Sequence, residues 1–253
     1  MCKLNNDIRW NVPGTYNANR QVFLLDKQTG DVNGDNIPDV VYLAGEKGDK
    51  PFYENIRVIV QDGRTMQRYI IPLYPQYDIG IDPWLFLGNF TNSGVDEIFV
   101  NLPTPGSGAL TYYYVISFRN NNAGYLLSTP QFLALAEPLH YEVIYQNDYK
   151  VLVKSDKLNQ SYILDVSDRK ESYEGTVYNK EGKLIKPLNG FVIDFPHLYP
   201  VRFDGSQPYK LMALQDIAGT AHVDELGSIV TYWKYSGGMR WILEPETFFV
   251  MLV

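Results

Sequence analysis

The stretch Asp31-Val-Asn-Gly-Asp-Asn-Ile-Pro-Asp39, followed directly by the apolar run Val40-Val-Tyr-Leu43, carries most of the structural information in this sequence. Acidic and amide side chains alternate along it, and the glycine and asparagine between them tolerate the positive φ of a tight turn. A second apolar run, Gln21 to Asp26, precedes the stretch. We therefore expect a polar loop that joins two β-strands.

The oxygen-bearing residues of this loop have the spacing of a calcium site. Calcium takes about six to eight oxygen ligands, which alternate residues of one loop can supply. Three carboxylates within nine residues repel one another, and a bound cation offsets that repulsion. The alternative is a solvated Asx turn without metal. The predicted ligands of one calcium ion are Asp31, Asn33, Asp35 and Asp39, with the backbone carbonyl of Ile37.

Loops of the same shape recur along the chain, each between two apolar runs. Their last residues are Asp39, Glu97, Lys150 and Lys210, at intervals of 58, 53 and 60 residues. Hairpin turns with glycine recur with a similar period, at Gly63, Gly124, Gly182 and Gly238. Each period contains about four strand-like runs, which is the content of one propeller blade. In the first period the runs are Asp39 to Gly45, Asn55 to Gln61, Thr65 to Pro72 and Trp84 to Gly88.

These periods predict an all-β fold with little helix, a small β-propeller of four or alternatively five four-stranded blades. We expect a single domain over residues 1–253, with repeats at about 20–82, 83–138, 139–196 and 197–253. The apolar run Thr247 to Val253 resembles Gln21 to Asp26, so the terminal strands are expected to close the ring and remove exposed sheet edges. An irregular β-sandwich is the alternative.

Residues 31–41 resemble the repeat motif of the FG-GAP/VCBS family, the integrin alpha-like repeats of bacterial type, and Gly88 to Ile98 resembles a decayed copy. Fainter segments, including Asp216 to Gly227, extend the resemblance over most of the chain. The resemblance implies a β-propeller that is often exported and acts as a binding or scaffold module. The second loop keeps only the carboxylate of Glu97 at a ligand position, and the fourth has Arg202 and Lys210, so calcium is expected in the first loop alone.

Composition excludes some functions. A net charge of -7 argues against nucleic-acid binding, which needs clustered Lys and Arg. No apolar run approaches the roughly 20 residues of a membrane span. The only cysteine is Cys2, so no intramolecular disulfide is expected. The first residues lack the apolar stretch of a signal peptide, which predicts a cytoplasmic location. A monomer is expected. Export or a place at the cell surface is the alternative, if a leader before Cys2 has been removed.

Candidate catalytic groups are few, because the histidines lack metal-ligand spacing and no nucleophile motif stands out. The segment Gly106 to Gly108 is more simply a strand connection. Near Thr220, alternation along an extended chain would put His222 and Asp224 on one side, as an acid/base pair or a weak metal site. A loop whose polar groups satisfy the backbone is the favoured interpretation. The aromatic residues Trp84, Tyr112, Tyr113, Tyr114, Tyr232, Trp233 and Trp241 are assigned to the core in preference to a sugar or peptide site.

The sequence thus predicts a calcium-binding, non-enzymatic module with a protein or glycan ligand. A carbohydrate-active hydrolase or lyase with its site in the central channel is one alternative. A lectin-like module with exposed aromatic side chains is the other.

Overall fold

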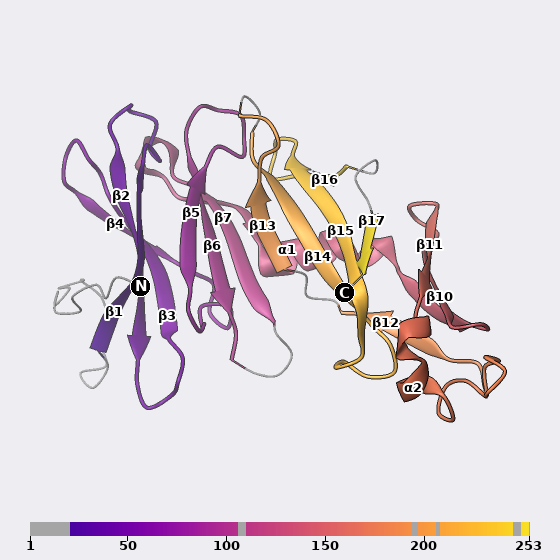
Figure 1. Ribbon diagram of the computed structural model, residues 1–253. Helices are drawn as coiled ribbons and strands as arrows, with labels where there is room; N and C mark the ends of the chain where they lie inside the picture. Colours follow the sequence, from indigo (N-terminus) through magenta and orange to yellow (C-terminus); the bar gives the residue numbers. More distant parts are fainter. Residues whose placement is uncertain (1–20, 106–109, 194–196, 206–207, 245–248, 253) are drawn as a thin grey trace. The chain divides into compact units, whose positions relative to one another are not determined.

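The computed structural model describes residues 21–105, 110–193, 197–205, 208–244 and 249–252 (Figure 1). Cys2 and the segment Gly106 to Gly108 lie outside these ranges. Internal contacts divide the chain into two compact units. Unit 1 is Met1–Thr129 with Arg202–Tyr209 and Tyr235–Arg240, and unit 2 is Pro130–Val201 with Lys210–Lys234 and Trp241–Val253.

The first sheet of unit 1 is antiparallel, with its four strands paired in chain order. Its second strand is buried on both faces, because Val41 and Leu43 join the main core while Tyr42 and Ala44 pack into a smaller cluster on the opposite face. The strands are β1 (Gln21–Gly30), β2 (Asp39–Lys47), β3 (Glu54–Gln61) and β4 (Arg68–Pro72).

The second sheet of unit 1 is also four-stranded, antiparallel and paired in chain order. Val58 of the first sheet and Val100 and Tyr114 of the second are fully buried in one shared apolar cluster. Each such side chain contributes about 2 kcal/mol on burial, so this cluster is the core of unit 1. The elements are β5 (Trp84–Gly88), β6 (Glu97–Pro103), β7 (Thr111–Ser117), the short 3-10 helix η1 (Arg119–Asn121) and β8 (Gly124–Ser128).

The remaining strands form one nine-stranded sheet with the order β11-β10-β9-β12-β14-β15-β16, in which β13 also pairs with β14 and β17 with β15. Alternate residues of β10 are buried, as expected for a strand with one face on a core. That core includes Val151, Tyr178 and Ile217. The strands are β9 (Glu142–Gln146), β10 (Lys150–Ser155), β11 (Gln160–Asp165), β12 (Asn189–Val192), β13 (His197–Val201), β14 (Lys210–Ala218), β15 (Glu225–Tyr235), β16 (Trp241–Leu243) and β17 (Phe249–Leu252).

Helical segments are short among the described residues. They are α1 (Thr129–Ala136), η2 (Glu137–Leu139), η3 (Ser167–Arg169) and α2 (Lys170–Tyr173), besides η1. No described helix has the length and apolar character that crossing a membrane requires.

The predicted β-propeller is wrong, although the predicted strand runs correspond closely to β2, β3, β4 and β5. The described strands form two open four-stranded sheets and one larger sheet, with no closed ring. The physical reason is β12, which pairs with β9 on one side and with β14 on the other and so joins strands that the period assigns to separate blades. Ring closure is also wrong, because β1 pairs with β2 whereas β17 pairs with β15.

Candidate functional site

The predicted calcium loop connects β1 to β2, and the paired residues Gly30 and Asp39 stand at its ends. Asp39 is fully buried, and its carboxylate accepts the backbone N–H groups of Val32 at 3.1 Å, Asn33 at 3.2 Å and Gly63 at 2.9 Å. Burial raises the pKa of Asp39, while the three N–H groups oppose that rise. Asp39 therefore ties the start of its own loop and the turn after β3 to the first residue of β2.

Asp31 closes the outer part of the loop. Its carboxylate oxygens accept the backbone N–H groups of Gly34 at 2.7 Å and Asn36 at 2.9 Å. Both of these residues have positive φ, 88° for Gly34 and 64° for Asn36, as the sequence predicted for so tight a wrap.

Asp35 forms an ion pair with Arg64 of the same chain. Its Oδ2 accepts the Nε–H of Arg64 at 2.7 Å, and its backbone carbonyl accepts a second guanidinium N–H at 3.1 Å. Its Oδ1 accepts the N–H of Ile37 at 2.8 Å, and its own N–H bonds to Oδ1 of Asn33 at 3.0 Å. Hydrogen bonding to Arg64 lowers the pKa of Asp35. The arginine supplies positive charge beside this loop carboxylate.

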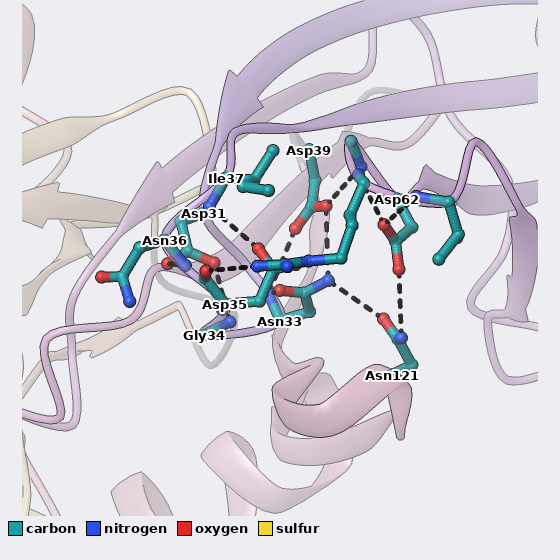
Figure 2. A network of polar contacts seen from close by, with 12 residues as sticks. Asp31, Asn33, Gly34, Asp35, Asn36, Ile37, Asp39, Asp62 and Asn121 are labelled. Carbon is teal, nitrogen blue, oxygen red and sulfur yellow. Dashed lines mark hydrogen bonds and ion pairs between the residues drawn. The ribbon is translucent and has the colours of Figure 1, made fainter.

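A side-chain bridge reaches the loop from η1, as Figure 2 shows. Asn33 donates to Oδ1 of Asn121 at 3.2 Å, and Asn121 donates to Oδ2 of Asp62 at 3.2 Å. Asp62 also accepts the N–H groups of Arg64 and Thr65 at 2.8 and 2.9 Å, and its pKa is lowered, with the Thr65 N–H as the largest cause. The sequence predicted a turn at Asp62. It gave no sign that Asn121 would contact Asn33, which lies 88 residues earlier in the chain.

The five predicted calcium ligands thus lie in one loop. The carboxylates of this loop accept hydrogen bonds from N–H groups of the protein itself. Among the described residues, no group of three or more His, Cys, Asp or Glu is arranged to hold a metal ion. An entering calcium ion would compete with Arg64 for Asp35 and with backbone N–H groups for Asp39. Calcium at this loop stays a prediction that only a titration tests.

The loop between β5 and β6 ends in Glu97, which pairs with Gly88. Glu97 is buried, and its Oε2 accepts the N–H groups of Phe90 at 2.7 Å and Thr91 at 3.1 Å. The Thr91 hydroxyl donates to Oε1 at 2.6 Å. Burial raises the pKa of Glu97, while these donors favour its charged form. In the third and fourth loops a lysine stands at the equivalent position, and Lys150 pairs with Asp165 and Lys210 with Glu244.

Asp224, which an alternative interpretation of the sequence pairs with His222, forms its hydrogen bonds with other residues. Its Oδ2 accepts the N–H of Thr220 at 2.7 Å and the hydroxyl at 3.0 Å, while its Oδ1 accepts the Tyr173 hydroxyl at 2.7 Å and Arg169 at 3.1 Å. Burial raises the pKa of Asp224, but these donors together lower it below its ordinary value. A hollow of about 500 Å³ adjoins Asp224 and Tyr173, whose polar atoms are already bonded to each other.

His222 does not join this network, so the acid/base pair that was considered as the less favoured alternative is not formed in this structure. Its ring packs edge-on against Phe191, with the ring centroids 4.8 Å apart. The favoured interpretation of this segment, a loop whose polar groups satisfy the backbone, agrees with the two bonds between Asp224 and Thr220. Most of the aromatic cluster is core as well, since Tyr113, Tyr114, Tyr232, Trp233 and Trp241 are all buried.

The sequence did not predict a second hollow of unit 2, a pocket of about 760 Å³ lined by residues of α1, η2, β9, β12 and β14. Ala134 of α1 and Phe191 of β12 give part of the lining an apolar character. Glu137 of η2, Glu142 of β9 and Gln215 of β14 are among its polar groups.

Gln215 is the unusual member of this lining. It is a polar residue that is only 5% exposed, and it contributes to the pocket wall. Its side-chain amide offers two N–H donors and a carbonyl acceptor to a molecule in the pocket. Alternation along β14 places Gln215 on the same face as buried Ala213 and Ile217, a signal that the sequence contains.

The fold and these sites define an open-sheet β-protein with two polar loop clusters in unit 1 and a ligand-sized pocket in unit 2. The chain belongs to the YybI family. A model of the YybI C-terminal domain matches residues 139–249. The uncharacterized protein YybI of Bacillus subtilis strain 168 is 38% identical over 219 residues, which are 86% of this chain and 81% of that protein. No solved structure matches. The predicted membership of the FG-GAP/VCBS family is therefore wrong.

Proposed function

We propose that this protein is a non-enzymatic binding protein that holds a small molecule in the pocket of unit 2. The observation that carries the proposal is a pocket with a polar amide in its wall, because Gln215 is only 5% exposed and lines the pocket. A bound molecule with a polar group could form hydrogen bonds with that amide. The volume of about 760 Å³ falls within the range of small-molecule sites, which combine mostly apolar walls with a few polar groups.

The chemistry of the lining supports binding without catalysis. Its described residues include no serine, threonine, cysteine or lysine, so the candidate reactive side chains are Glu137, His140, Tyr141 and Glu142. Of its two carboxylates, Glu142 is held by Lys154, with Oε1 and Nζ 2.9 Å apart. Glycoside hydrolysis requires a pair of carboxylates, and one of the two in this lining is engaged in that ion pair.

A saccharide is a second candidate ligand, which the exposed ring of Phe191 favours. This ring is 36% exposed in the pocket lining, and the amides of Asn189 and Gln215 offer donors and acceptors to hydroxyl groups. Such a ligand would make the protein lectin-like.

The test is a thermal-shift screen of small molecules and monosaccharides on the full chain. A ligand that binds only the folded state at about 100 times its Kd adds roughly 2.7 kcal/mol of stability. Ala134→Trp places a large side chain in the pocket and should abolish the shift. Gln131→Trp, at an exposed position of the same helix outside the lining, should preserve it. Stabilisation that persists in Ala134→Trp, or its absence with every compound, would overturn the proposal.

A further inference from the structure

We infer that the ligand of the unit 2 pocket carries a positive charge, an inference that rests on the proposed function. Two carboxylates line the pocket, Glu137 and Glu142, and the described lining contains neither lysine nor arginine; its other titratable side chains are His140 and Tyr141. A cavity wall with one sign of charge attracts a ligand of the opposite sign.

Nearby cations do not fully neutralise the negative charge of these two glutamates. Lys154 lies outside the lining, with its Nζ 2.9 Å from Glu142 and 3.4 Å from Asp156, so one cation serves two carboxylates. Glu137 is exposed, and no ion pair joins it to another residue in the described part of the chain. Glu137 is therefore the carboxylate that is available to form an ion pair with a cationic ligand.

The rest of the lining suits an amine on an apolar body. Ala134 and Phe191 offer apolar contact, and an aromatic ring attracts a cation that approaches its face. The carbonyl oxygen of Gln215 accepts hydrogen bonds, and an ammonium group has three to donate. A primary alkylamine or arylalkylamine satisfies these features together.

The experiment compares three probes that share one apolar body: 2-phenylethylamine, 2-phenylethanol and phenylacetate. Calorimetric titration of the full chain at neutral pH should rank the amine about tenfold above the alcohol, with the carboxylate weakest. Added salt should weaken the amine and leave the alcohol unchanged, because salt screens only the charged pair.

Two variants assign the preference to one carboxylate. Glu137→Gln should bring the affinity for the amine close to that for the alcohol, without changing the affinity for the alcohol. Glu181→Gln, an exposed glutamate of unit 2 outside the lining, should leave both unchanged.

The outcomes separate this inference from the proposed function. If the alcohol or the carboxylate binds as tightly as the amine, or if Glu137→Gln keeps the full preference, the ligand is not selected by charge although the pocket still binds. If none of the three probes binds, and the thermal screen finds no compound whose shift Ala134→Trp removes, the pocket is not a binding site. Both the inference and the proposed function then fail.

Discussion

Asp39 and Glu97 bear the same relationship to their own loops, although they lie in different sheets of unit 1. Each is the first residue of a strand, and each carboxylate accepts the backbone N–H groups of the residues seven and six positions before it. Both are buried. A carboxylate at this position fixes an eight-residue loop by satisfying backbone donors that would otherwise be buried without partners.

Replacing Asp39 should destabilise the protein strongly. Asp39→Ala leaves the N–H groups of Val32, Asn33 and Gly63 without their acceptor, and we expect a loss of about 3 kcal/mol in the free energy of unfolding. Asp49→Asn changes an exposed carboxylate and should alter stability by less than about 0.5 kcal/mol. Urea unfolding measures both. Equal stability of the two variants would contradict the role given to Asp39.

Calcium, if it enters the first loop, must displace Arg64 from Asp35. We therefore expect calcium to raise the melting temperature relative to a chelator, Arg64→Gln to increase that rise, and Asp35→Ala to abolish it. Differential scanning calorimetry with calcium and with EDTA gives the comparison. No calcium-dependent shift in the wild type or in Arg64→Gln would exclude the predicted site.

Asp224 should make stability sensitive to acid. The folded state lowers its pKa below the ordinary value of 3.8, so its contribution is complete well above that value and disappears as pH falls through the folded pKa. Asp224→Asn should be less stable than wild type by about 2 kcal/mol at pH 7, and the difference should shrink below about pH 4. Asp168→Asn, at an exposed position, is the control. A difference that is constant from pH 7 to pH 2.5 would refute this assignment.

A side chain at position 219 should destabilise the protein. A Cβ at this position would lie 2.3 Å from Oδ2 of Asp224 and 2.3 Å from the hydroxyl oxygen of Tyr145. We expect Gly219→Ala to cost about 2 kcal/mol or more, since the crowded network has to move. Gly124→Ala meets open space and should be nearly neutral. Matched unfolding curves for the two variants check the expectation.

The strands of unit 1 could be predicted from the sequence because alternation and turn residues act locally. The runs predicted at Asp39 to Gly45 and Trp84 to Gly88 lie within β2 and β5. Pairing could not be predicted, since the four-residue β12 carries no local sign that it joins β9 to β14. Periodicity shows where strands recur and leaves open which edges meet.

The first loop was recognised from its oxygen-bearing residues, but the pattern does not distinguish a metal from protein donors. Arg64 and Asn121, which bond to Asp35 and Asn33, are brought there by the fold. The pocket of unit 2 depends on residues from five elements and was not predicted, although Gln215, a polar residue on the buried face of β14, is a signal that the sequence contains.

The most direct test of the central claim is the side-chain amide resonance of Gln215 in the nitrogen-15 spectrum, assigned by its loss in Gln215→Met. During titration with 2-phenylethylamine, that resonance should shift and saturate with the calorimetric Kd, while the amide of exposed Gln28 in unit 1 stays in place. A Gln215 signal that does not move while the amine binds, or that moves no more than Gln28, would contradict a ligand site in this pocket.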